Sequence, residues 1–266
     1  MLLTRVLTGV ALGAALLAAI FLLPPLEFQV IVALIVAASA YEWSRLCGIA
    51  SRWPALAYAA VSALAYDAVV QLPLLADAVL WIAGAFWLLV VPAWLARGLR
   101  SSQKGWLALA GLLVIVPAGA AMEMLDRVSL VLLIGLCVVA DTAAYFTGRT
   151  LGRHKLAPVI SPGKTWEGAL GGVVACAIYA IILTMFHPGL GARVTGASWA
   201  PYAVAAVLLC ALSVLGDLFE SALKRTVGVK DSGTLLPGHG GLLDRIDSAT
   251  AVLPVGALLL RQFGGL

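Results

Sequence analysis

The residues best suited to chemistry gather in one window, residues 216–248. The chain as a whole is 62% hydrophobic and only 11% charged, yet this window is dense in acids and bases. Its charged members are Asp217, Glu220, Lys224, Arg225, Lys230, Asp231, Asp244, Arg245 and Asp247. A membrane protein concentrates charge in this way where water, ions or a charged substrate reach it. The window is therefore the first candidate for an active site.

Three aspartates of this window form a candidate site for a hard cation. Asp244 and Asp247 share what we expect to be the first turn of the last helix. Asp217 lies at the end of the preceding helix, and the loop between the two helices can bring it back to them. Carboxylate oxygens are ligands that Mg²⁺ prefers. His239 has no second His or Cys near it in the sequence, so a zinc site is disfavoured.

The bases of the window lie on the same helix face as Asp217. If the helix continues past residue 218, one polar stripe contains Asp217, Glu220, Ser221, Lys224 and Arg225. The stripe has two interpretations. It can be a ladder of ion pairs within the helix, or it can hold a metal at Asp217 and phosphate oxygens at Lys224 and Arg225. The position of Asp217 at the membrane end favours the second interpretation.

A glycine-rich run, PGHGG at residues 237–241, separates the stripe from Asp244. Such a run cannot form regular helix, and Gly240 and Gly241 allow the backbone to approach a ligand closely. A single histidine such as His239 is more often a structural hydrogen-bonding group than a catalyst. We predict a ligand-binding loop here, with a catalytic role for His239 left open.

A second polar loop, residues 149–166, carries Lys164 with the hydroxyls of Ser161 and Thr165. The sequence Gly-Lys-Thr suggests a P-loop, but that motif needs a glycine where this chain has Pro158, and we expect no strand before it. A cationic loop that leads into a helix N-terminus suits a phosphate group. The other cations of the loop are equally well explained as charges on the cytoplasmic side of the membrane.

An isolated acid, Asp141, lies within an apolar run just before this loop. With Tyr145 and Arg149 it follows a spacing of four residues, which places all three on one helix face. An intramembrane carboxylate is costly unless it has a partner or faces water. Asp141 is therefore either hydrogen-bonded to a neighbouring helix or directed into a functional cavity, and we favour the cavity.

The rest of the chain predicts an all-α, polytopic transmembrane bundle of about nine spans. The mean hydropathy is +1.04, and apolar runs near the length of a span recur throughout. The runs are residues 4–23, 27–45, 54–75, 77–96, 106–123, 129–148, 167–187, 199–218 and 248–264. With the N-terminus inside and the C-terminus outside, only Arg127, Arg193 and Arg261 of the 17 Lys and Arg residues fall outside the cytoplasmic segments.

We expect two parts with different roles. Residues 1–128 hold the first five spans, which we interpret as scaffold and dimer contacts. Residues 129–266 hold the remaining four spans and both polar loops, 149–166 and 219–247, and form the catalytic region. Carboxylates for Mg²⁺, cations for phosphates and a glycine-rich loop are what phosphoryl transfer requires.

The window from 216 to 248 resembles, at matching spacing, the signature of the phosphatidate cytidylyltransferases, or CDP-diacylglycerol synthases. The matching residues are Ser221, Lys224, Arg225, Lys230, Asp231, Pro237, His239, Gly240, Gly241, Asp244, Arg245 and Asp247. The stretches ADTAAYFTGR and SPGKTWEG resemble two further blocks of that family in the same order. The resemblance is specific over residues 129–248 and generic before them.

The resemblance implies synthesis of CDP-diacylglycerol and pyrophosphate from CTP and phosphatidate at the cytoplasmic face of a bacterial inner membrane. It also implies a homodimer, no nucleic-acid partner, and Mg²⁺ with a monovalent cation such as K⁺ beside it. Asp217 and Asp244 would be the principal metal ligands. The catalytic set would be Asp217, Asp244, Lys224, Arg225 and Asp247. The substrate-binding set would be Asp141, Ser161, Lys164, Thr165, Ser221, Lys230, Asp231, His239, Gly240, Gly241 and Arg245.

Two other functions stay open at this point. A CTP-dependent kinase of a membrane alcohol would use the same residue types but would transfer the γ-phosphate. An ion-coupled transporter could use Asp141 and Asp217 as an ion path. Transporters commonly show inverted repeats and broken spans, and no such repeat is visible here. Charges clustered on one side of the membrane also favour chemistry at a surface over passage through it.

Overall fold

The structure is a computed structural model that describes the backbone of residues 2–186, 188–236, 238 and 240–262. Its helices are α1 (Leu2–Leu22), α2 (Pro25–Leu46), α3 (Arg52–Gln71), α4 (Pro73–Ala85), α5 (Val91–Arg97), α6 (Lys104–Met124), α7 (Arg127–Leu151), α8 (Trp166–Phe186), α9 (Pro188–Arg193), α10 (Trp199–Thr226) and α11 (Leu243–Gln262). A π-helical turn, Phe86–Val90, joins α4 to α5, and short 3₁₀ turns at Ser101–Gln103 and Gly196–Ser198 precede α6 and α10. The all-α class is confirmed.

Fewer helices are long and apolar enough to span a membrane than the nine spans predicted. Within the described residues, seven helical segments qualify: α2, α3, the continuous α4–α5 segment, α6, α7, α8 and α10. The apolar part of α1, Gly9–Leu22, is shorter than a typical span. α11 does not qualify, and it carries Asp244, Arg245 and Asp247 near its start. Nine spans with the N-terminus inside therefore remain a prediction.

The expectation that no strand occurs between residues 149 and 166 is wrong. β1 (Lys155–Ala157) and β2 (Ser161–Thr165) form an antiparallel hairpin with Lys155 opposite Thr165. The hairpin closes on α8, because the amide of Trp166 donates to the carbonyl of His154 at 2.9 Å. A chain that must return within a few residues from α7 to α8 satisfies its backbone groups by pairing them with each other. Pro158 still rules out a P-loop.

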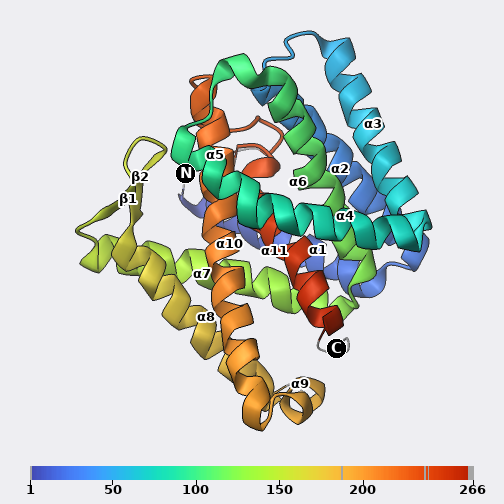
Figure 1. Ribbon diagram of the computed structural model, residues 1–266. Helices are drawn as coiled ribbons and strands as arrows, with labels where there is room; N and C mark the ends of the chain where they lie inside the picture. Colours follow the sequence, from blue (N-terminus) through green and yellow to red (C-terminus); the bar gives the residue numbers. More distant parts are fainter. Residues whose placement is uncertain (1, 187, 237, 239, 263–266) are drawn as a thin grey trace.

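The helices that surround the polar window are packed around α10, which runs through the middle of Figure 1. α7 and α8 lie against it on one side, and α11 packs against α10, α6 and α7. The ring of Phe219 on α10 lies 5.8–6.0 Å from the rings of Trp43, Phe86, Trp87 and Trp94. This buried aromatic cluster ties α10 to α2 and to the α4–α5 segment. α10 is therefore held rigidly where its polar stripe begins.

Close packing of α7 on α8 fixes the base of the hairpin. Gly168 lies against Ala144, and a Cβ added to it would come within 2.7 Å of the carbonyl oxygen of Ala144. Gly172 lies similarly against Ala140, where an added Cβ would be 3.2 Å from that residue's carbonyl oxygen. Small residues permit such approach between helices in a membrane. The small residues at the start of α8 therefore serve helix packing.

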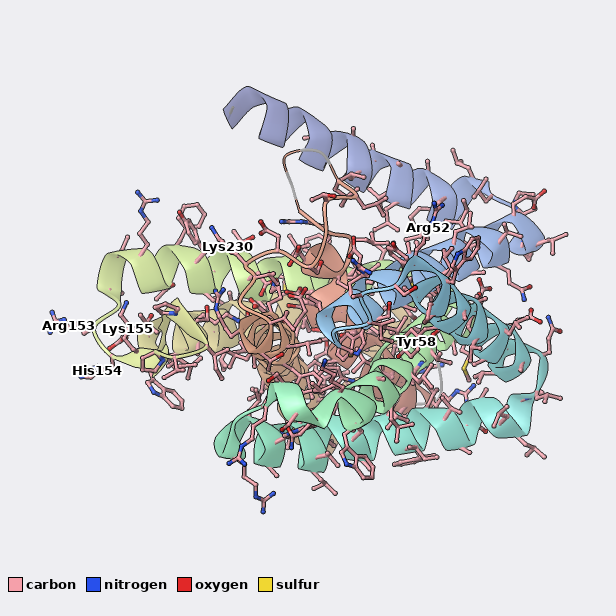
Figure 2. The ribbon with its side chains drawn as sticks, turned by 90° about the horizontal axis from the view of Figure 1, so that it is seen from above. Arg52, Tyr58, Arg153, His154, Lys155 and Lys230 are labelled. Carbon is pink, nitrogen blue, oxygen red and sulfur yellow. The ribbon has the colours of Figure 1, made fainter. Side chains whose placement is uncertain are left out.

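α1 makes the least contact with the remainder of the bundle. Figure 2 shows it along the margin of the molecule, with its N-terminal half directed away from the other helices. Val10, Leu17 and Leu22 on this helix are 66%, 47% and 77% exposed. An apolar helix with so much exposed side-chain surface needs lipid or another protein surface around it. It contributes no residue to the site described next.

Candidate active site

A cavity of about 710 Å³ lies between the end of α7, the β1–β2 hairpin, the start of α8 and the facing parts of α10 and α11. Two of the motifs found in the sequence, the 149–166 loop and the 216–248 window, meet in it. Its charged lining residues, among those described, are Asp141, Arg149, Lys155, Lys164, Asp217, Asp244 and Asp247. Ser161 and Thr165 also line it. The fold therefore brings together seven of the predicted site residues: Asp141, Ser161, Lys164, Thr165, Asp217, Asp244 and Asp247.

Asp217 is joined to the hairpin by an ion pair. Its Oδ2 lies 2.6 Å from Nζ of Lys164 on β2, and the two side chains are 28% and 23% exposed. Its Oδ1 accepts a hydrogen bond from Ser221 Oγ one turn further along α10, at 3.1 Å. Asp217 thus faces a cation across the cavity instead of a base on its own helix. The hairpin places that cation, which explains why the pairing could not be read from helix periodicity.

Lys224 is buried and lies between two carboxylates. Its Nζ is 2.6 Å from Oε2 of Glu220 and 2.6 Å from Oδ1 of Asp244. The residue is only 7% exposed. The ion-pair ladder is therefore present for Glu220 and Lys224, whereas Asp217 at the head of the same stripe pairs elsewhere. A buried cation with two anions is held strongly in place, since loss of one member leaves an uncompensated charge.

The second oxygen of Asp244 holds the loop that precedes α11. Asp244 Oδ2 accepts from the amide of Ser232 at 2.9 Å, from its hydroxyl at 3.0 Å, and from the amide of Gly241 at 2.8 Å. Gly240 next to it has a φ of +83°, and an added Cβ would lie 2.8 Å from Asp244 Oδ2. The predicted glycine-rich loop is thus folded onto a carboxylate of the site. Pro237 and His239 lie outside the described residues.

Asp141 and Asp247 complete the acidic side of the cavity. Ser248 Oγ lies 3.3 Å from Asp141 Oδ2 and 3.1 Å from the carbonyl oxygen of Ser213. The amide of Ser248 donates to Asp247 Oδ1 at 2.7 Å. Asp141 therefore satisfies both sequence interpretations, because it contacts a neighbouring helix and also lines the cavity. It lies ten residues before the end of α7, which is about 15 Å along a helix.

Cations line the hairpin side of the cavity. Arg149 at the end of α7 donates from Nη1 to the hydroxyl of Tyr145 at 2.7 Å. Lys155 on β1 also lines the cavity, and Figure 2 shows it with Arg153 and His154 at the far end of the molecule. Thr165 was predicted to bind phosphate, and here its hydroxyl accepts from the amide of Gly168 at 3.1 Å in the first turn of α8.

Several predicted site residues lie outside the cavity. Arg225 is exposed and donates to the carbonyl oxygens of Ile160 at 3.3 Å and Val229 at 2.9 Å. Its guanidinium therefore supports the hairpin turn and its own loop. Three further members, Lys230, Asp231 and Arg245, are exposed and do not line the cavity among the described residues. Asp231 is nonetheless close to Gly240, whose added Cβ would lie 3.3 Å from the Asp231 Cβ.

One acid of this region was missed in the sequence. Glu42 on α2 is only 6% exposed and accepts hydrogen bonds from the loop before α11. It comes near the end of an apolar run, AASAYEWSRL, which is the same signal that drew attention to Asp141. Sequence reasoning treated residues 1–128 as scaffold and did not apply that signal there.

A metal at these carboxylates would need further ligands from water or from a bound phosphate group. Among the described residues, no three His, Cys, Asp or Glu side chains converge closely enough to bind a metal alone. Mg²⁺ commonly takes one or two carboxylates, with waters and substrate phosphates as its other ligands. Asp217 and Asp244 each present one oxygen to a lysine ammonium at 2.6 Å, so each already faces a positive charge. Both carboxylates line the same cavity.

Comparison with known proteins gives the same family over the full length. A family model described as the cytidylyltransferase family matches residues 3–263. A phosphatidate cytidylyltransferase of Pseudomonas aeruginosa is 39% identical over 272 aligned residues, 99% of this chain and 98% of that protein. Shorter alignments reach proteins of the same name, with 51% identity in Haemophilus influenzae and 47% in Staphylococcus haemolyticus, over 43% and 47% of this chain and 39% and 45% of theirs.

The alignment over nearly the whole chain and the geometry of the cavity agree with the motifs read from the sequence. This chain belongs to the phosphatidate cytidylyltransferase family of enzymes.

Proposed function

We propose that this enzyme makes CDP-diacylglycerol and pyrophosphate from CTP and phosphatidate. One observation carries the proposal: a cavity lined by aspartates and lysines opens among membrane-spanning helices in a chain that aligns end to end with a phosphatidate cytidylyltransferase. In the reaction a phosphate oxygen of phosphatidate attacks the α-phosphorus of CTP. The bond from that phosphorus to the β-phosphate oxygen breaks in line, and pyrophosphate leaves.

The cations of the hairpin are suited to the nucleotide phosphates. Lys164 lines the cavity and contacts Asp217, and Arg149 and Lys155 line its hairpin side. In phosphoryl-transfer sites, positioning and neutralisation of charge supply most of the catalysis. Lys164 would exchange its contact with Asp217 for a phosphate oxygen. Lys224 keeps Asp244 in place and adds a buried positive charge behind it.

We place Mg²⁺ at Asp217 and Asp244, with a monovalent cation such as K⁺ beside it and Asp247 as a neighbouring carboxylate. When bound, the divalent ion would neutralise developing charge on the phosphates and orient them. The two carboxylates hold this position on separate helices, α10 and α11, and their lysine partners set the orientation of each side chain. Asp141 lines the same cavity and contributes a further carboxylate.

The location of the cavity suits a lipid substrate. Part of its wall comes from α7, α8 and α10, which are long and apolar enough to span a membrane. Acyl chains could therefore stay in the bilayer while the phosphate meets a nucleotide from the water phase. We place the cavity at the cytoplasmic face of a bacterial inner membrane, where CTP is available, and expect a homodimer. The asymmetric distribution of Lys and Arg supports this orientation.

The decisive experiment uses CTP labelled at either the α- or the γ-phosphate. Purified protein in detergent is given phosphatidate, Mg²⁺ and one of the two nucleotides, and the lipid is extracted. We expect label from the α position in the lipid product and label from the γ position in pyrophosphate. Label from the γ position in lipid would instead establish a CTP-dependent kinase. No lipid labelled from the α position, with folded protein, would contradict the proposed reaction.

A further inference from the structure

Glu42 lies on α2, in the N-terminal half of the chain, and contacts the loop that precedes α11 at the active site. Its carboxylate accepts from Ser232 Oγ at 3.1 Å, and from the amides of Leu242 and Leu243 at 3.0 Å each. These partners are 190 to 201 residues away in the sequence. The two amides belong to the N-terminal end of α11, whose first N–H groups have no partner within the helix. A carboxylate there also interacts favourably with the helix dipole.

The helix that carries Glu42 is itself immobilised. The neighbouring Trp43 is 1% exposed and donates from Nε1 to the carbonyl oxygen of Leu107 on α6 at 2.8 Å. Its ring lies 6.0 Å from that of Phe219 on α10. Gly111 on α6 makes room for it, since an added Cβ there would come within 2.4 Å of the indole. Glu42 is thus presented from a rigid part of the bundle.

The loop is shaped around this carboxylate. A Cβ added to Gly233 would lie 2.5 Å from Glu42 Oε1, and one added to Gly241 would lie 2.6 Å from Glu42 Oε2. Such distances are far shorter than any ordinary contact of a Cβ, so a side chain at either position would displace the carboxylate. The two glycines therefore serve the fit to Glu42, in addition to any approach to a ligand.

The hydroxyl of Ser232 links Glu42 to Asp244, the predicted metal ligand. Ser232 Oγ lies 3.1 Å from Glu42 and 3.0 Å from Oδ2 of Asp244, and its single hydrogen can serve one of them at a time. The amide of Gly241 donates to the same oxygen of Asp244. Displacing the loop would therefore change the donors that orient Asp244.

We propose that Glu42 is a positioning residue for nucleotidyl transfer. It fixes Ser232, Gly241 and the first turn of α11, and through them the orientation of the Asp244 carboxylate. The proposal rests on the function proposed above, but it assigns a role in catalysis to a residue of the N-terminal half. Glu42 acts through other groups and need not touch either substrate.

The first test is Glu42→Gln, which preserves shape and replaces one acceptor oxygen by an NH₂ group. Because both oxygens accept from backbone amides, one amide must lose its partner. We expect kcat to fall by about tenfold or more, the effect of losing a hydrogen bond to a charged group. The matched control is Glu27→Gln, the same change at an exposed position of the same helix, which should leave kcat unchanged.

The second test measures the loop without using activity. Hydrogen–deuterium exchange of the detergent-solubilised protein should speed up in peptides that cover residues 231–243 of the Glu42→Gln variant. Peptides that cover the hairpin, residues 149–166, should exchange as in the parent protein. A general rise of exchange over many helices would mean that Glu42 stabilises the whole fold, and would overturn a positioning role.

Ser232→Ala removes the same contact from the other side and guards against a variant that fails to fold. We expect Ser232→Ala to lower kcat, and the double variant to be little worse than the more damaging single variant, as for residues that act as a unit. Independent, multiplying losses would contradict the shared role. So would parent-like kcat in Glu42→Gln with the loop exchange raised.

The two proposals fail in different ways. If the parent protein forms no α-labelled lipid, the proposed reaction is wrong and with it the catalytic role of Glu42. If the parent is active and the Glu42→Gln variant matches it in kcat, only the positioning role is lost.

Discussion

The four helices α7, α8, α10 and α11 have a polar cavity at one end and an apolar cavity at the other. The polar cavity measures about 710 Å³ and contains aspartates and lysines. The apolar cavity measures about 80 Å³ and is lined chiefly by leucine, alanine and tyrosine side chains, with Arg193 at its edge. Leu132 of the apolar cavity and Asp141 of the polar one lie on the same helix, about 13 Å apart along its axis.

This difference shows which end of the bundle can accommodate charged side chains. At the apolar end, Tyr179 and Tyr202 donate their hydroxyls to the carbonyls of Leu132 and Ala180, at 3.1 and 2.8 Å, and α8 connects to α10 through the short helix α9. At the polar end, the hairpin and the loop before α11 supply the lysines and amides that balance the carboxylates. Charge is tolerated there because Asp141, Asp217 and Asp244 each have a partner from another element.

The largest expected effect concerns which end faces the cytoplasm, because labelling is all or none. Lys230→Cys near the polar end and Ala197→Cys near the apolar end both replace exposed residues. In intact spheroplasts, a membrane-impermeant thiol reagent should label Ala197→Cys and should reach Lys230→Cys only after permeabilisation. The four natural cysteines are buried and give a low background.

The opposite labelling pattern would invert the predicted topology. Labelling of both variants in intact spheroplasts would show that α10, which separates the two positions, does not cross the membrane. Native Cys47 is only 2% exposed, so the reagent cannot reach it from either side and it does not report the topology.

The next largest effect is the loss of a carboxylate from the polar cavity. Asp217→Asn and Asp244→Asn keep the shape of the side chain and remove its charge. Each should lower turnover more than about a hundredfold, beyond the effect usual for residues that only support a ligand, and each should raise the Mg²⁺ concentration needed for half-maximal rate. If the two share one ion, the double variant should be little worse than the worse single.

Asp67→Asn is the matched control, because Asp67 lies on α3 and its contact is with Gln29. Unchanged Mg²⁺ dependence in Asp244→Asn, with Asp217→Asn affected, would assign Asp244 to holding Lys224 and the loop. Fully additive losses of turnover in the double variant would contradict a shared metal site.

A smaller effect should separate the two lysines. Lys164→Ala removes a partly exposed cation, so activity should fall about 10- to 150-fold while the fold persists, as expected for a charge-assisted contact. Lys224→Ala leaves Glu220 and Asp244 without their buried partner, which should destabilise the protein by about 3–5 kcal/mol. Thermal unfolding in detergent, measured beside activity, distinguishes the two outcomes.

Lys104→Ala, at an exposed position at the start of α6, is the control for removal of a lysine. Equal thermal stability of Lys224→Ala and the parent would contradict the burial argument. Normal activity of Lys164→Ala would mean that Lys164 only adds to the general positive charge of the cytoplasmic side.

The smallest effect belongs to the apolar end. Tyr202→Phe removes one hydroxyl that donates to the carbonyl of Ala180. We expect a loss of about 1 kcal/mol in stability and unchanged kcat. A clear fall in kcat, with the protein still folded, would show that the two ends are coupled and that the apolar end is more than a scaffold.

Much of this protein follows from the sequence alone. Most predicted apolar runs fall on one helix over their described residues, because apolar segments in a membrane must satisfy their backbone groups internally. The run 54–75 instead crosses from α3 into α4. The polar stripe of α10 follows from helix periodicity, and α10 does continue to Thr226. The motifs also located both loops that meet at the cavity and the aspartates that line it.

Tertiary structure decided which charges pair. Lys164 binds Asp217 because a hairpin, not a loose loop, returns the chain to α8. Lys224 is committed to Glu220 and Asp244, and Arg225, its neighbour in sequence, points to the hairpin turn. Periodicity fixes which residues share a helix face. It does not fix which other helix that face meets, and so the contact of Glu42 with a loop some 200 residues away could come only from packing.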